Sequence, residues 1–311
     1  MANAGSPMSL SLRLRPFIAP ALFIAPAAVA LILTMAVPMA DAVVLSLQNW
    51  NGMAPPTWAG FSNYLRLLHD ETFARALWHT AYFTVCTVIL QTILPLLIAS
   101  LLNSGIRGST VFRTLYFMPV IISLAISGLL WAMLFEPNFG AVNGFLRAVG
   151  LGSFTQLWLA GPYTVMPSVI IVSVWQSLGF YLVIFFAALQ GVPKELYEAA
   201  QLDGANAWSR FLNVTVPTIR PVILIVIVLN SINGIKVFDQ IWVMTAGGPN
   251  YASATLGTYL YSIAFGAMGA SNSRLGYATA IAIVILLLSV VVSMIQIRLG
   301  RRRDLDSQIE M

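Results

Sequence analysis

Charged residues are scarce in this sequence. Of its 311 residues, only 9% are Asp, Glu, Lys or Arg, whereas 59% are hydrophobic. A soluble domain carries about 25% charged residues, so this chain has too few polar groups to cover a water-facing surface. The excess apolar surface must face lipid, which predicts an integral membrane protein.

Cysteine, histidine and lysine are nearly absent as well. The single cysteine, Cys86, cannot form a disulfide within the chain, and the two histidines do not form a metal-ligand pattern. Neither of the two lysines, Lys194 and Lys236, follows a glycine as in the Gly-Lys-Ser/Thr of a phosphate-binding loop. We therefore expect no metal site, no cofactor, no nucleic-acid partner and no enzymatic activity in this chain.

Acidic residues are almost excluded from the long apolar runs. Asp239 is the one carboxylate that falls inside such a run. Transporters driven by an ion gradient usually place carboxylates within the membrane. A secondary transporter or channel that works without ATP is therefore a remote alternative for this chain.

Six apolar runs are long enough to span a bilayer, which takes about 20 helical residues. The first run exceeds the apolar core of a signal peptide, usually about 7–15 residues, so we expect it to remain as a span. The sequence predicts an all-α, polytopic membrane protein. Its runs cover residues 17–40, 77–102, 115–135, 163–189, 218–244 and 276–297.

The basic residues predict how these spans are oriented. With the N-terminus in the cytoplasm, eleven of the 16 Lys and Arg residues fall in cytoplasmic segments. Cytoplasmic segments of membrane proteins are enriched in these residues, so both termini are expected inside. The predicted organisation is a cytoplasmic tail over 1–16, a membrane domain over 17–299 and a basic cytoplasmic tail over 300–311. Outer segments are expected near 41–76, 136–162 and 245–274.

The cytoplasmic segment 190–217 contains the signals of two short helices. Pro193 suits the first position of a helix, and Gly204 suits a left-handed stop. Asn206 can cap a second helix over 207–214, which Pro217 is expected to end. The sequence thus predicts a helix, a glycine turn and a helix on the cytoplasmic membrane surface.

This segment resembles the "EAA" loop of permease subunits of ABC importers. Glu198, Ala199, Ala200, Asp203 and Gly204 stand at the positions of that motif, with Pro217 following. The resemblance implies an ABC-importer permease fold and a loop that docks on an ATPase subunit, which binds the ATP and Mg²⁺.

Three further stretches resemble the maltose-type carbohydrate uptake group of this family. They are residues 58–64, 112–119 and 238–249, and the last is typical of the first of two unlike permeases. The resemblance implies a second homologous permease as heterodimer partner, two copies of the ATPase and an extracytoplasmic sugar-binding protein. It also implies a multi-pass protein of the bacterial inner membrane that forms half of the pathway for a sugar or oligosaccharide.

Polar residues in the middle of a span are expected to face protein or a cavity, because lipid cannot satisfy them. The fifth run is polar and interrupted by glycine at its centre, which indicates a transport site. Polar contacts between packed helices are the alternative for each of these residues. The candidate path residues are Asn230, Asn233, Trp175, Gln176 and Tyr181.

Two groups beside the fifth run are candidates for gating or for contact with the binding protein. Lys236 and Asp239 are spaced to pair with each other on a helix. Gly247, Gly248 and Pro249 predict a turn in an outer segment. An anionic substrate would favour a positive charge on the path, and Lys236 is the only candidate for it within a span. A permease for glycerol phosphate or another decorated polyol therefore stays open as an alternative.

Overall fold

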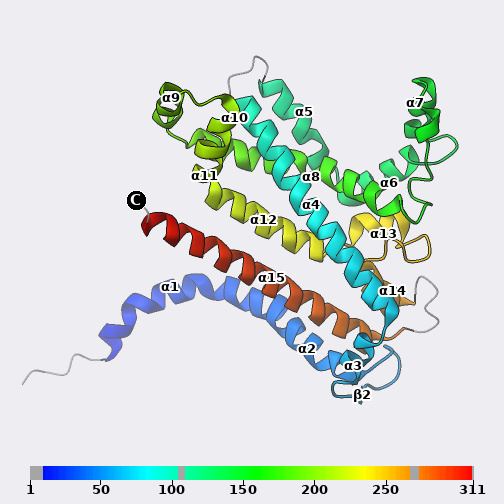
Figure 1. The fold of residues 1–311 in the computed structure, drawn as a ribbon. Coiled ribbons are helices and arrows are strands. Elements are labelled where there is room, and N and C mark those ends of the chain that lie inside the picture. The colour runs from blue at the N-terminus through cyan, green and yellow to red at the C-terminus, as the bar shows by residue number, and fades with distance from the viewer. Residues whose placement is uncertain (1–9, 104–108, 267–272, 310–311) are drawn as a thin grey trace, which may run out of the picture.

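The structure is a computed structural model, and it describes residues 10–103, 109–266 and 273–309 (Figure 1). Within these ranges nearly all regular structure is helical, as predicted. The strands of the described residues form one short antiparallel hairpin, β1 (Gln48–Asn49) with β2 (Thr57–Trp58). The helices run between two ends of the molecule, with α9 to α11 and the C-terminus of α15 at one end.

Four helical segments are long and apolar enough to cross a membrane. Leu22–Ser46 combines the C-terminal part of α1 (Leu10–Leu31), a π-helical turn (Ile32–Ala36) and α2 (Val37–Ser46). The others are α4 (Glu71–Asn103), α8 (Val165–Gln190) and Leu275–Gly300 within α15 (Leu275–Ile309). With two further bent helix pairs, the described residues provide up to six spans, which agrees with the six predicted runs.

The third predicted span, 115–135, is formed by two helices that meet at a sharp bend. α5 (Ser109–Ile121) and α6 (Leu124–Leu134) meet at 103°. Pro119 has no N–H to donate within α5. Ser123 then caps α6, because its hydroxyl accepts a hydrogen bond from the backbone N–H of Ile126 at 3.4 Å.

The fifth predicted span, 218–244, is interrupted within its length. α12 (Arg220–Ile235) ends at residue 235, and α13 (Asp239–Thr245) begins after a non-helical break at residues 236–238. The polar sequence around Gly234 favours this break, since glycine is a weak helix former. Phe238 has φ −144° and ψ −65°, which is outside the helical region.

The outer segments contain helices that were expected to be loops. They are α3 (Ser62–Leu68), α7 (Ala141–Ala148), a 3₁₀ turn (Gly152–Phe154) and α14 (Leu256–Phe265). A capping box between Thr255 and Thr258 starts α14, and Gly266, at φ +68°, ends it. At ten residues, α14 is too short to be read as a span from sequence.

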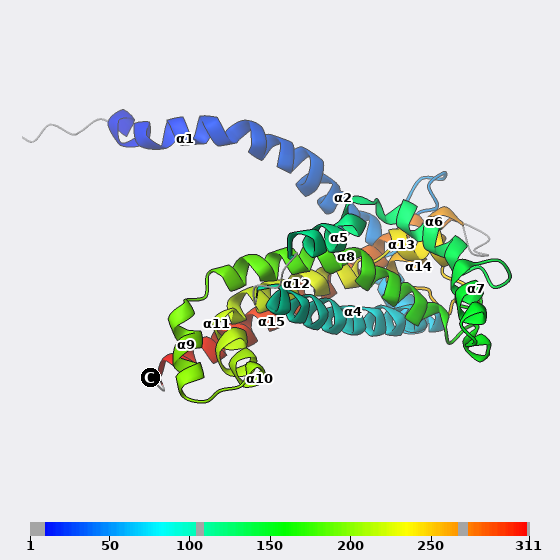
Figure 2. The same ribbon diagram turned by 90° about the horizontal axis from the view of Figure 1, so that it is seen from above.

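α8 lies at the centre of the molecule and α1 lies at its edge. The inner face of α8 packs on α4 and α12 through one cluster of buried side chains, and on α4 and α13 through a second. By contrast, large side chains such as Phe23 and Leu33 on the first helix are exposed. Figure 2 shows this helix extending away from the other helices.

Candidate functional site

A polar cavity of about 510 Å³ lies where α12 breaks, between α4, α8, α12 and α13. Four of the five predicted path residues line it, namely Asn230, Asn233, Gln176 and Tyr181. The other polar lining residues are Thr87, Gln91, Ser173, Ser177, Lys236, Asp239 and Gln240.

Several buried amide groups of this cavity have no hydrogen-bond partner in the protein. Asn230 is 1% exposed, and neither atom of its side-chain amide is paired. Gln176 donates to the carbonyl of Ile122 at 3.0 Å but leaves its own Oε1 unpaired. Gln240 accepts from the hydroxyl of Ser173 and leaves its Nε2 unpaired. Buried polar groups are normally paired, so these atoms call for water or a ligand.

The rest of the lining is held by contacts between helices. Gln91 on α4 donates to the carbonyl of Ser173 on α8 at 3.1 Å. Asn233 on α12 interacts with the hydroxyl of Tyr181 on α8. Gly234 lets α12 approach α4 closely, since a Cβ there would lie 2.8 Å from the hydroxyl oxygen of Thr84. The helices therefore present a fixed set of donors and acceptors to the cavity.

Trp175, Lys236 and Asp239 do not make the contacts that were predicted for them. Trp175 is outside the cavity lining and packs edge-on against Trp131, with ring centroids 5.4 Å apart. Lys236 and Asp239 both line the cavity but do not form an ion pair. Among the described residues, the only pair within 4.0 Å is Arg75 with Glu71.

The predicted glycine turn folds back on the protein. Gly247, at φ +83°, is buried, and Gly248 and Pro249 are half-buried. Ser253 donates to the carbonyl of Gly248 at 2.6 Å, and its hydroxyl also contacts that of Thr245 at 2.8 Å. The turn is thus held by its own hydrogen bonds, with little of Gly247 left for a partner to touch.

The segment resembling the coupling loop forms α9 (Lys194–Leu202), α10 (Ala207–Arg210), a π-helical turn (Phe211–Thr215) and α11 (Val216–Thr218). Gly204 has φ +80°, and the N–H of the next residue, Ala205, donates to the carbonyl of Ala200 at 2.9 Å. This is a Schellman ending for α9. The side chain of Asn206 caps α10 by accepting from the N–H of Ser209 at 2.8 Å. Both local predictions are confirmed.

Two details of this segment differ from the prediction. Pro193 precedes α9 as its N-cap instead of occupying the first helical position. Pro217 does not end the second helix; it lies in the first turn of α11, where its missing N–H is tolerated. The backbone therefore continues as one bent unit to Ile219, where it turns by 74° into α12.

The motif residues of α9 face outward. Glu198, Ala199, Asp203 and Gly204 are exposed, and Ala200 is half-buried. Large apolar side chains surround them, with Leu202 89% and Trp208 60% exposed. A hydroxyl contact of 3.0 Å between Tyr197 and Thr215 ties α9 to the following turn. Exposed apolar surface around a rigid helix is typical of a protein interface.

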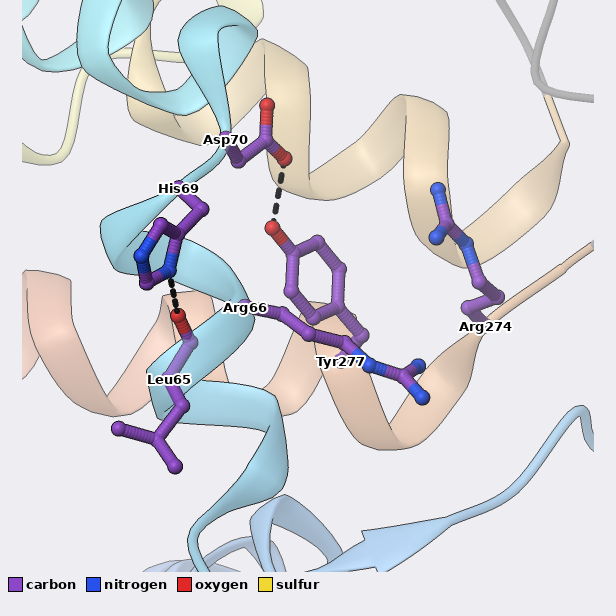
Figure 3. A pocket seen from close by; sticks show the side chains of 6 residues that line it. All are labelled: Leu65, Arg66, His69, Asp70, Arg274 and Tyr277. Carbon is purple, nitrogen blue, oxygen red and sulfur yellow. Dashed lines mark hydrogen bonds between the residues drawn. The ribbon is translucent and has the colours of Figure 1, made fainter.

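A second site, at the opposite end, was missed from sequence. Asp70 caps α4 by accepting from the N–H groups of Thr72 and Phe73. It also accepts from the hydroxyls of Tyr259 at 2.5 Å and Tyr277 at 2.6 Å, and Figure 3 shows the contact with Tyr277. Burial raises the pKa of Asp70, but these four hydrogen bonds outweigh it and hold the pKa below its usual value. The two tyrosines come from α14 and α15, so no local pattern joins them to Asp70.

The sequence matches known proteins along most of its length. The profile of the family described as "Binding-protein-dependent transport system inner membrane component" matches residues 91–305. The chain is 36% identical to the probable ABC transporter permease protein YurN of Bacillus subtilis, covering 90% of this chain and 95% of that protein. It is 33% identical to the lactose transport system permease protein LacF of Rhizobium radiobacter, covering 91% and 94%.

A solved structure is similar over nearly the whole chain. It is a bacterial ABC transporter involved in the import of the acidic polysaccharide alginate. The similarity has a TM-score of 0.80 at 25% identity and covers 94% of this chain and 98% of that chain.

Proposed function

Because the chain belongs to the family of binding-protein-dependent transport system inner membrane components, we propose that it forms half of the translocation pathway of an ATP-driven importer for a sugar or oligosaccharide. The observation that carries the proposal is the cavity at the α12 break, with unpaired amide atoms on Asn230, Gln176 and Gln240. The printed names of relatives, such as the lactose and diacetylchitobiose permeases, support a carbohydrate as the solute.

The chemistry of the cavity suits an uncharged sugar. Sugar hydroxyls both donate and accept hydrogen bonds, and the unpaired amide atoms include donors and acceptors. A buried polar group left unpaired costs about 1–3 kcal/mol. A sugar that forms hydrogen bonds with these amide atoms is therefore stabilised in the cavity. An apolar solute would leave the amide atoms unpaired and gain nothing.

The exposed α9 surface provides the proposed link to the energy source. Glu198 is exposed between apolar side chains, so an arginine of an ATPase subunit can pair with it as α9 enters a cleft. The rigid turn at Gly204 then transmits movement through α11 to α12, which lines the cavity. We infer one ATPase copy beneath this chain and one beneath a second, homologous permease.

The proposed assembly also includes an extracytoplasmic sugar-binding protein and lies in the bacterial inner membrane, with both chain ends in the cytoplasm. The positions of α9 and of the C-terminal end of α15 at one end of the molecule support this orientation. A solved relative, whose structure is similar in fold, contains a ligand-bound periplasmic protein. The outer segments of this chain are where such a protein would dock.

A permease for glycerol phosphate or another decorated polyol is the second candidate. Lys236 lines the cavity and supplies a positive charge for an anion. Asp239 lines the same cavity and opposes that charge, which favours a neutral solute.

Uptake into proteoliposomes that contain the complete importer tests the proposal. We expect a neutral oligosaccharide to accumulate only when ATP and the loaded binding protein are present. Accumulation of glycerol phosphate alone would favour the second candidate and would be abolished by Lys236→Gln. Accumulation without ATP would contradict the importer and favour a secondary transporter.

A further inference from the structure

A groove at the end of the molecule opposite α9 is lined by two arginines that lack an acidic partner. It consists of two hollows of about 410 and 380 Å³, which share Arg66, Arg274 and Tyr277. In the described parts of the chain, the single ion pair within 4.0 Å joins Arg75 to Glu71. Neither groove arginine is therefore neutralised by contact with a described carboxylate.

The floor of the groove positions this positive charge. The guanidinium of Arg274 lies over the ring of Tyr277, 5.3 Å from its centroid. Asp70 lines the same groove, but its oxygens already accept from two tyrosine hydroxyls and two backbone N–H groups. Figure 3 shows the guanidinium groups of Arg66 and Arg274 on the same side of the Tyr277 ring. The two guanidinium groups keep donors for an acceptor from outside, and guanidinium binds phosphate particularly well.

The helix that carries Arg66 also carries an apolar ridge. Phe61, Leu65 and Leu68 are 72%, 59% and 78% exposed and follow one another at the spacing of one helical face. Leu65 belongs both to this ridge and to the groove. The other face of α3 is fixed to the protein, since Asn63 donates to the carbonyls of Ser46 at 2.9 Å and Gln48 at 3.0 Å.

A helix with an exposed apolar face beside basic side chains lies in the membrane interface. α3 lies directly between the ends of two spans, as Ser46 ends one and Glu71 begins the next. Exposed Trp58 and Trp78 flank it in the sequence, and tryptophan is enriched at this depth of the membrane.

We propose that this groove binds an anionic phospholipid, with the lipid phosphate held between Arg66 and Arg274 and the acyl chains lying along Phe61, Leu65 and Leu68. A soluble phosphate or an acidic side chain of a partner protein would pair with the arginines but leave the apolar ridge in water. A lipid satisfies both features at once. The inference concerns the membrane surface and is independent of the solute that the chain transports.

Native mass spectrometry of the full-length chain tests the site. The purified chain is equilibrated in micelles that contain equal amounts of phosphatidylglycerol and phosphatidylcholine, and the retained lipids are counted. We expect wild type to retain phosphatidylglycerol preferentially. Arg66→Gln and Arg274→Gln should each reduce this preference about fivefold, as expected for one arginine near an anionic headgroup.

Arg75→Gln is the matched control, because this arginine is nearby but already paired with Glu71; it should keep the preference. Leu65→Ser should weaken retention of the lipid while leaving Arg66 and Arg274 in place. Equal retention of both lipids by wild type would overturn the proposal. Full displacement of phosphatidylglycerol by millimolar inorganic phosphate would also overturn it. The same holds if a variant with both arginines replaced keeps the lipid preference but no longer binds an acidic partner protein.

Discussion

Asn230→Leu separates a transport role of the cavity from a packing role. The two residues are similar in size, and the change removes two buried polar atoms that lack a partner in the protein. An unpaired buried polar group costs about 1–3 kcal/mol. The variant should therefore unfold at the same temperature as wild type or a higher one.

The same change should impair transport. If the sugar pairs with both atoms of the amide, at about 0.5–1.5 kcal/mol for each hydrogen bond, the variant loses about 1–3 kcal/mol of stabilisation along the path. The rate of uptake at a fixed concentration of loaded binding protein should then fall roughly 5- to 150-fold. Thermal unfolding of the purified chain and uptake by the complete importer are the two measurements.

Asn143→Leu is the matched control, because Asn143 is equally buried but fully paired. Its amide donates to the carbonyls of Pro137 and Gln156 and accepts from the backbone N–H of Gln156 and the indole N–H of Trp158. This change should lower the unfolding temperature and leave uptake per folded molecule unchanged. If Asn230→Leu instead destabilises the chain as much as Asn143→Leu does and transports normally, the reasoning about the cavity is refuted.

Three further predictions follow from the contacts. Gly204→Val should weaken ATPase binding in a pull-down and lower the unfolding temperature, because a β-branched residue cannot easily adopt φ +80° even though the surroundings are open; normal binding would argue against a rigid turn. Asp70→Asn should lower the unfolding temperature near pH 7. Because the hydrogen bonds hold the pKa of Asp70 below its usual value, the difference in unfolding temperature between variant and wild type should vanish as pH falls through the pKa of the folded protein. A difference that grows in acid would contradict the hydrogen-bond account. Gly179→Ala should destabilise the chain by about 1–3 kcal/mol, because its Cβ would lie 2.1 Å from the carbonyl oxygen of Tyr116, whereas Gly144→Ala on α7 meets nothing within 4 Å and should have little effect in the same thermal assay.

Features encoded by a few adjacent residues could be predicted from the sequence. The left-handed stop at Gly204 and the cap at Asn206 depend on positions one to five residues away, and both were predicted correctly. The apolar runs likewise predicted the spans, because lipid imposes the same length on each of them.

Features that depend on packing could not be read from the sequence. The break after α12 places Asn230 and Lys236 at one cavity, but Ser173 and Gln240 join them from α8 and α13. Nothing in the sequence near Gln240 indicates whether its amide lines a cavity or hydrogen-bonds between packed helices. Similarly, Asp70 lies about 190 residues from Tyr259, so only the folded helices bring this carboxylate to its donors.

A pull-down of the tagged chain from mild detergent tests most directly whether α9 couples this permease to an ATPase. Wild type should recover a second permease and an ATPase. Glu198→Arg should lose the ATPase and keep the second permease, because the exposed carboxylate is replaced by the opposite charge. Recovery of the ATPase with the variant as well as with wild type would contradict the coupling role of α9. Recovery of wild type alone, still moving solute in vesicles without ATP, would contradict the importer itself.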